Sequence, residues 1–98
     1  MMDTPEITRD DGGSKGRYVL RDPATDAEAE LTYSRLSAQA IIIDHTGVPD
    51  AMRGTGAGAA LVARAVADAR AEGVKITPLC PFVAAQFRRH PDWHDVLA

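Results

Sequence analysis

Residues 53–59 combine an arginine with small residues in a way that favours the binding of an anion. Small side chains allow backbone N–H groups to approach a ligand closely, and a helix that begins within the segment adds partial positive charge at its N-terminus. The usual ligand of such a loop is a phosphate group. The predicted binding residues are Arg53, Gly54, Thr55, Gly56, Ala57, Gly58 and Ala59.

His45 and Cys80 are the side chains best suited to proton transfer or nucleophilic attack. Each follows an apolar segment that reads as a strand, and the carboxyl ends of parallel strands gather at one edge of a sheet. His45 can act as a base, because a histidine has a pKa near ~6.5, or can brace the loop that follows it. A helix N-terminus lowers a thiol pKa from ~8.5, although a lone cysteine is commonly a small buried apolar residue. We predict that both are catalytic and lie close together.

Three phosphate-binding patterns compete for the glycine-rich segment. A P-loop requires Lys followed by Ser or Thr after its last glycine, whereas Ala59 follows Gly58. A dinucleotide loop requires an acidic residue at the end of the next strand, ~20 residues on, and residues 74–78 contain none. The third pattern, Arg/Gln-x-x-Gly-x-Gly/Ala, fits Arg53, Gly56 and Gly58.

That third pattern resembles the pyrophosphate-binding motif of the GNAT superfamily of N-acetyltransferases. The wider sequence is similar to a minimal GNAT family of about one hundred residues, whose motifs are His-Thr-x-Val-Pro, Arg-Gly-x-Gly-x-Gly, Pro-x-Cys-Pro-Phe and His-Pro. Here these motifs occupy residues 45–49, 53–58, 78–82 and 90–91, in the same order.

The resemblance implies an acetyl-CoA-dependent N-acetyltransferase that transfers an acetyl group to an amine of a small molecule or peptide. It implies that the glycine-rich loop holds the diphosphate of coenzyme A, and that Thr46 and Val48 lie along its pantetheine arm. Cys80 would lie near the thioester, as proton donor or as nucleophile. The alternatives are an acyl-CoA-binding module without catalysis, which would not need His45 or Cys80, and a small interaction domain without a ligand.

The pattern of apolar residues predicts an α/β (α+β) fold that would bring these residues together. Apolar and polar residues alternate in residues 17–21 and 28–35, which is typical of half-buried strands joined by short turns to antiparallel neighbours. Residues 40–43 are continuously apolar, which predicts a central strand buried on both faces. The predicted elements are strands at 6–9, 17–21, 28–35 and 38–46, a crossover helix at 56–72, a parallel fifth strand at 74–79 and a short helix at 81–89.

Length and composition limit the classes of protein that remain. The 98 residues suit one domain, with residues 1–5 expected to be disordered. A net charge of −3 argues against nucleic-acid binding. The lone cysteine suits the cytoplasm, and no segment approaches the ~20 apolar residues of a membrane helix. Pro91 separates His90 from His94 and argues against a metal site. We expect a monomer or a weak homodimer.

Overall fold

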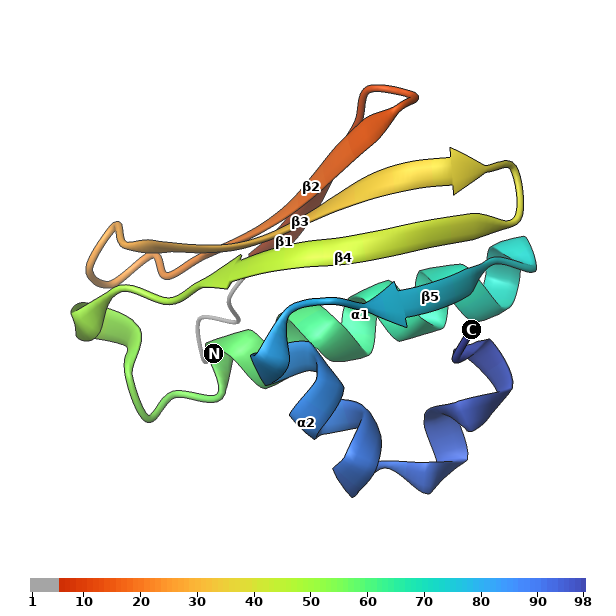
Figure 1. Cartoon of the computed structure of the whole chain (residues 1–98). Coiled ribbons are helices and arrows are strands. Elements are labelled where there is room, and N and C mark those ends of the chain that lie inside the picture. Colours follow the sequence, from red (N-terminus) through yellow and green to blue (C-terminus); the bar gives the residue numbers. More distant parts are fainter. Residues whose placement is uncertain (1–5) are drawn as a thin grey trace.

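The computed structural model describes residues 6–98 of the chain, so the expected disorder of residues 1–5 lies outside it. Its elements alternate as the sequence predicts, with strands first and the crossover helix after the fourth strand (Figure 1). They are β1 (Glu6–Asp11), β2 (Lys15–Arg21), β3 (Glu28–Ser37), β4 (Ala40–Gly47), the short helix η1 (Asp50–Met52), α1 (Ala57–Glu72), β5 (Lys75–Pro78), α2 (Pro81–Arg89) and the short helix η2 (Pro91–Val96).

The sheet has the order β1-β2-β3-β4-β5. Neighbours among the first four strands are antiparallel, and β5 is parallel to β4. The predicted mixed sheet, crossover helix and short C-terminal helix are therefore confirmed. Strand β2 starts earlier than expected, because Gly16 pairs with Tyr33 instead of lying in a turn. A Cβ at Gly16 would lie 2.0 Å from Cζ of Tyr33, so the aromatic ring requires glycine there.

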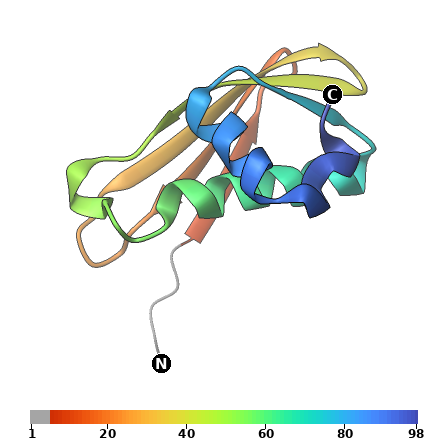
Figure 2. The same cartoon turned by 60° about the horizontal axis from the view of Figure 1, so that its bottom comes forward.

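Both α1 and α2 cover the same face of the sheet, which we call the inner face (Figure 2). The core lies between these helices and the sheet. The stripe of apolar residues predicted on the crossover helix is buried in this core. Within residues 6–98, no helix covers the opposite, outer face (Figure 1). The expectation that β4 is buried on both faces is therefore wrong, since Ile41 and Ile43 are buried but Ile42 on the outer face is only half-buried.

A β-bulge near the end of β4 decides which side chains face the helices. Thr32 pairs with His45 and Tyr33 with Ile43, so Asp44 is an additional residue on β4. Paired residues of antiparallel strands point to the same face. The bulge therefore places His45 on the outer face, beside Thr32. The next residue, Thr46, pairs with buried Leu31 and lies on the inner face.

Candidate active site

The glycine-rich loop contains two glycines whose backbone requires them. Gly54 and Gly56 have φ values of +78° and +81°, a region that other residues rarely adopt. An added Cβ at either position would meet no atom within 4 Å, so the space around them is open. Gly58 differs, because its Cβ would lie 2.8 Å from Cζ of Phe82. Packing of α2 against α1 explains that glycine.

The start of α1 offers several backbone donors to a ligand. Gly56 is the N-cap residue of the helix, and no side chain caps it. Among the described residues, none accepts a hydrogen bond from the N–H groups of Gly54, Gly56, Ala57, Gly58 or Ala59. The positive end of the helix dipole lies at the same place. These donors form the kind of cradle that binds phosphate at helix N-termini.

A cavity of about 440 Å³ adjoins these donors. It is lined by every predicted cofactor-binding residue except Thr55, which faces a neighbouring hollow and donates its hydroxyl hydrogen to the carbonyl of Met52. Three further residues line the cavity and were missed from the sequence: Met52, Phe82 and Gln86. Phe82 lies within the Pro-x-Cys-Pro-Phe motif, and Gln86 follows it by one helical turn, so the motif and the helical period together could have indicated both.

Arg53 is the cationic member of the loop. Its Nε lies 2.9 Å from a carboxylate oxygen of Asp50, and both side chains are largely exposed. An anion in the cavity would therefore share this guanidinium with Asp50. The backbone N–H groups of the cradle, by contrast, have no competing acceptor among the described residues.

Cys80 lies between β5 and α2, where it is the N-cap residue of α2. It is only 8% exposed, and its sulfur lies 3.6 Å from Oγ1 of Thr46 on β4. Burial by itself raises the pKa of the thiol, but hydrogen bonds from the backbone of Val83, from the Thr46 hydroxyl and from the backbone of Phe82 outweigh it. The net result is a pKa below the ordinary value, which suits a thiol that gives up its proton.

His45 does not lie beside Cys80 in the structure. Its ring is on the outer face, with Nε2 3.8 Å from a carboxylate oxygen of Glu30. Neither His45 nor Cys80 lines the loop cavity, although Thr46, the contact of Cys80, does. The predicted proximity of the two residues is therefore wrong, and the bulge at Asp44 is the physical reason.

A second hollow, of about 420 Å³, lies on the outer side of the end of β4. Val48 lines both this hollow and the loop cavity, so the two meet at the end of the strand. The residues around the outer hollow are mostly charged or small: Arg17, Glu28, Glu30, Gly47, Val48 and Pro49. The end of β4 is thus accessible from both faces of the sheet.

Two other kinds of structural feature are absent from the described residues. Within residues 6–98, no group of three or more His, Cys, Asp or Glu side chains could hold a metal ion. No helix in this part of the chain is long and apolar enough to cross a membrane.

A mixed sheet whose crossover helix begins at a glycine-rich anion cradle defines a class of nucleotide- or cofactor-binding α/β domain. The family described as GCN5-related N-acetyl-transferase matches residues 17–96, and the chain belongs to that family.

A solved structure supports the same assignment. It is the solution NMR structure of a GCN5-like protein from Staphylococcus aureus that its name proposes to be an N-acetyltransferase. The two proteins share 33% sequence identity and superimpose with a TM-score of 0.73, over 99% of this chain and 91% of that chain. No curated protein matches the sequence. The comparisons confirm the GNAT-type fold and family, and leave the roles of the individual motifs as predictions.

Proposed function

We propose that the protein is an acetyl-CoA-dependent N-acetyltransferase whose acceptor is an amine of a small molecule or a peptide. The observation that carries the proposal is the row of unpartnered N–H donors at the start of α1, beside a cavity of about 440 Å³. Each hydrogen bond from such a donor to a charged oxygen contributes ~1.5–3 kcal/mol. A diphosphate supplies several such oxygens, which a neutral ligand cannot.

Different residues of the cavity would contact different parts of the cofactor. The loop would hold the diphosphate, with Arg53 assisting, while Thr46 and Val48 would lie along the pantetheine arm. When bound, acetyl-CoA supplies an acetyl group activated as a thioester. Cys80, linked to the cavity through Thr46 at 3.6 Å, would give its proton to the leaving sulfur or would itself carry the acetyl group. The family resemblance favours direct transfer.

The outer hollow at the end of β4 is the proposed entrance for the acceptor. His45 lies at this face beside Glu30, where it would take a proton from the attacking amine. Two substrates that approach Val48 from opposite faces would meet at the end of the strand, which is the arrangement that transfer between them requires. We place this reaction in the cytoplasm, where a lone thiol stays reduced, and expect a monomer or weak homodimer.

An acyl-CoA-binding module without catalysis is the second candidate. Burial of Cys80 and its separation from His45 favour it, because neither side chain lines the cavity. Such a module would need the cradle and the cavity but neither of these residues.

Replacing Cys80 separates the two candidates. Cys80→Ala removes little volume, so folding and CoA affinity should persist, whereas acetyl-CoA turnover against a panel of amines should fall ~10²-fold or more, the scale for losing acid–base assistance. Cys80→Ser should retain part of the activity only if the residue relays a proton, since an unassisted hydroxyl is a poor nucleophile. Calorimetric titration with CoA provides the folding control. Full activity in Cys80→Ala makes the cysteine structural, and tight CoA binding without turnover by the wild type favours the binding module.

A further inference from the structure

Gln86 is unusual among the polar residues of the protein. Within residues 6–98 it is the one buried side chain that carries an amide or a charge, with 7% of its surface exposed. It lies on α2, one turn after Phe82, and both residues line the cavity beside the glycine-rich loop. A glutamine in this position brings a donor and an acceptor into an otherwise small and apolar part of the wall.

The carboxamide of Gln86 forms no hydrogen bond with any residue that the structure describes. Other polar groups that enter the core are paired: the Tyr18 hydroxyl donates to Asp68 at 2.8 Å, and the Tyr33 hydroxyl accepts from Arg9 at 3.1 Å. No side-chain nitrogen or oxygen that is sealed in the described part of the protein lacks a partner, so the unbonded amide atoms of Gln86 must open onto the cavity that the residue lines. Gln86 is therefore held ready for a group that is not part of the chain.

The helix that carries Gln86 is anchored in the core, which fixes the position of this residue beside the cavity. Val83 and Phe87, on either side of it along α2, are buried in the core. Phe87 also packs edge-on against Trp93, with ring centroids 5.9 Å apart. The carboxamide therefore stays at the wall of the cavity.

We propose that Gln86 binds a secondary amide of the pantetheine arm of coenzyme A, a role that rests on the proposed function. A carboxamide offers one carbonyl acceptor and N–H donors, which complement the N–H and C=O of a secondary amide. It is neutral, so it is poorly suited to the diphosphate, for which the loop already provides backbone donors and Arg53. The amides of the arm are the groups of the cofactor that match it.

Two probes that differ by the arm test the role of Gln86. Gln86→Leu should weaken CoA binding about tenfold in calorimetric titration, since an amide of the ligand loses its partner. Affinity for 3′-phosphoadenosine 5′-diphosphate, which lacks the arm, should not change. The melting temperature without ligand should stay level, because the carboxamide makes no hydrogen bond within the described part of the protein and opens onto the cavity. Gln86→Met, of similar length, provides a second variant if the leucine impairs folding, and exposed Gln39→Leu is the matched control.

Each alternative result has a defined meaning. Unchanged CoA affinity in both Gln86 variants overturns the assignment and leaves the proposed function intact. An equal loss for both probes, or a lower melting temperature in both variants, shows that the carboxamide supports the fold. Binding of neither probe by the wild type overturns the proposed function together with this role.

Discussion

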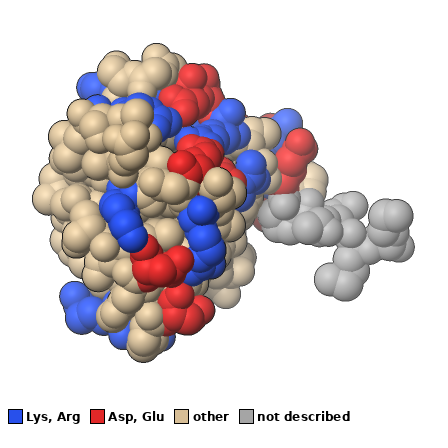
Figure 3. Space-filling model, turned by 90° about the vertical axis from the view of Figure 1, so that its right-hand side faces the viewer, with Lys and Arg blue, Asp and Glu red and all other residues tan. Residues whose placement is uncertain are grey.

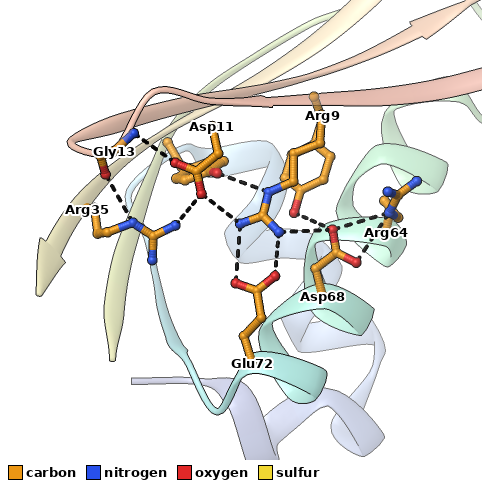
Figure 4. Close-up of polar contacts among 9 residues, drawn as sticks. Arg9, Asp11, Gly13, Arg35, Arg64, Asp68 and Glu72 are labelled. Carbon is orange, nitrogen blue, oxygen red and sulfur yellow. Dashed lines mark hydrogen bonds and ion pairs between the residues drawn. The ribbon is translucent and has the colours of Figure 1, made fainter. Parts of the chain in front are cut away.

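The two ends of α1 differ in whether their polar groups have partners in the protein. At its N-terminus, backbone N–H groups face a cavity without protein partners. Towards its C-terminus, Asp68 and Glu72 bind a network of charged and aromatic side chains from the sheet (Figure 4). The face of the molecule in Figure 3 likewise shows basic side chains lying next to acidic ones. The comparison indicates where the protein stabilises itself and where it leaves bonding capacity for a ligand.

Arg9 on β1 is the centre of the paired end. It contacts Asp68 at 3.5 Å and Asp11 at 3.4 Å, donates to the Tyr33 hydroxyl and pairs with Glu72 on α1. The hydrogen bond with Glu72, working against the opposing effect of burial, raises the pKa of Arg9 further above its ordinary value. The network joins the edge strand to the helix, two elements that the short turns of the sheet do not connect.

Of the changes considered, removing Asp68 should lower the stability of the protein most, because Asp68 belongs to the network at the C-terminal part of α1. The change leaves the hydroxyl of Tyr18, a residue that is only 1% exposed, without its hydrogen-bond acceptor. It also removes the carboxylate that Arg9 and Arg64 share. Asp68→Ala should lower the free energy of unfolding by about 2 kcal/mol in urea titration, with CoA affinity unchanged. The control is Asp95→Ala, which removes a half-exposed ion pair with Arg70 and should lower the free energy of unfolding much less, because water screens the pair. Equal losses would show that the network adds nothing beyond surface pairing.

Gly56→Asp should prevent anion binding at the N-terminus of α1 without unfolding the protein. It places a carboxylate at the helix N-terminus where the anion would bind, so CoA affinity should fall more than tenfold in calorimetric titration. Gly56→Asn is the matched control, because asparagine has the same shape without the charge and tolerates positive φ. Its loss should be smaller. A Gly56→Asp protein that binds CoA as tightly as the wild type would falsify the cradle.

Alkaline pH should lower the stability of the protein through Tyr18, which belongs to the paired end of α1. Burial raises the pKa of its phenol above the ordinary value, and the hydrogen bond to Asp68 raises it further. The folded state therefore keeps the neutral phenol, so this stabilisation is complete below pH ~10 and is lost above it at up to ~1.36 kcal/mol per pH unit. Urea titrations should cover pH 9 to 11, about one unit on either side of the reference pKa. Over this range the free energy of unfolding should decline more steeply for the wild type than for Tyr18→Phe. Identical slopes would contradict the assignment.

The smallest effect is expected at Arg53. Arg53→Ala should weaken CoA binding only a few-fold, because the guanidinium is exposed and already paired with Asp50. The loss should shrink at high salt as screening increases. Asp50→Asn frees the same guanidinium and should tighten binding slightly. If Arg53→Ala were as damaging as Gly56→Asp, the backbone donors would not be the principal attraction.

The sequence predicts the elements well because each follows from local pattern. The alternation of apolar and polar residues indicated β2 and β3, and the many alanines between Gly56 and Gly73 indicated α1. The loop residues were predictable for the same reason, since glycine and a helix start are both local signals.

The misses depend on contacts between distant segments. The bulge at Asp44 arises from pairing with β3, so the sequence of β4 alone did not show that His45 leaves the inner face. Ile42 was misassigned because a continuous apolar run does not reveal that both helices pack on one side. The partners of Arg9 lie up to 63 positions away, and no period or spacing connects them.

The additional residue at Asp44 has a consequence for how this gene can change in length. Domains usually absorb in-frame insertions and deletions in surface loops, where side-chain direction is not fixed. Strand β4 offers a further position, because loss of the Asp44 codon would leave Ile43, His45 and Thr46 paired with three consecutive residues of β3. Histidine would then still point to the outer face and threonine to the cysteine. One codon in the middle of this strand is thus dispensable to the direction of the side chains around it.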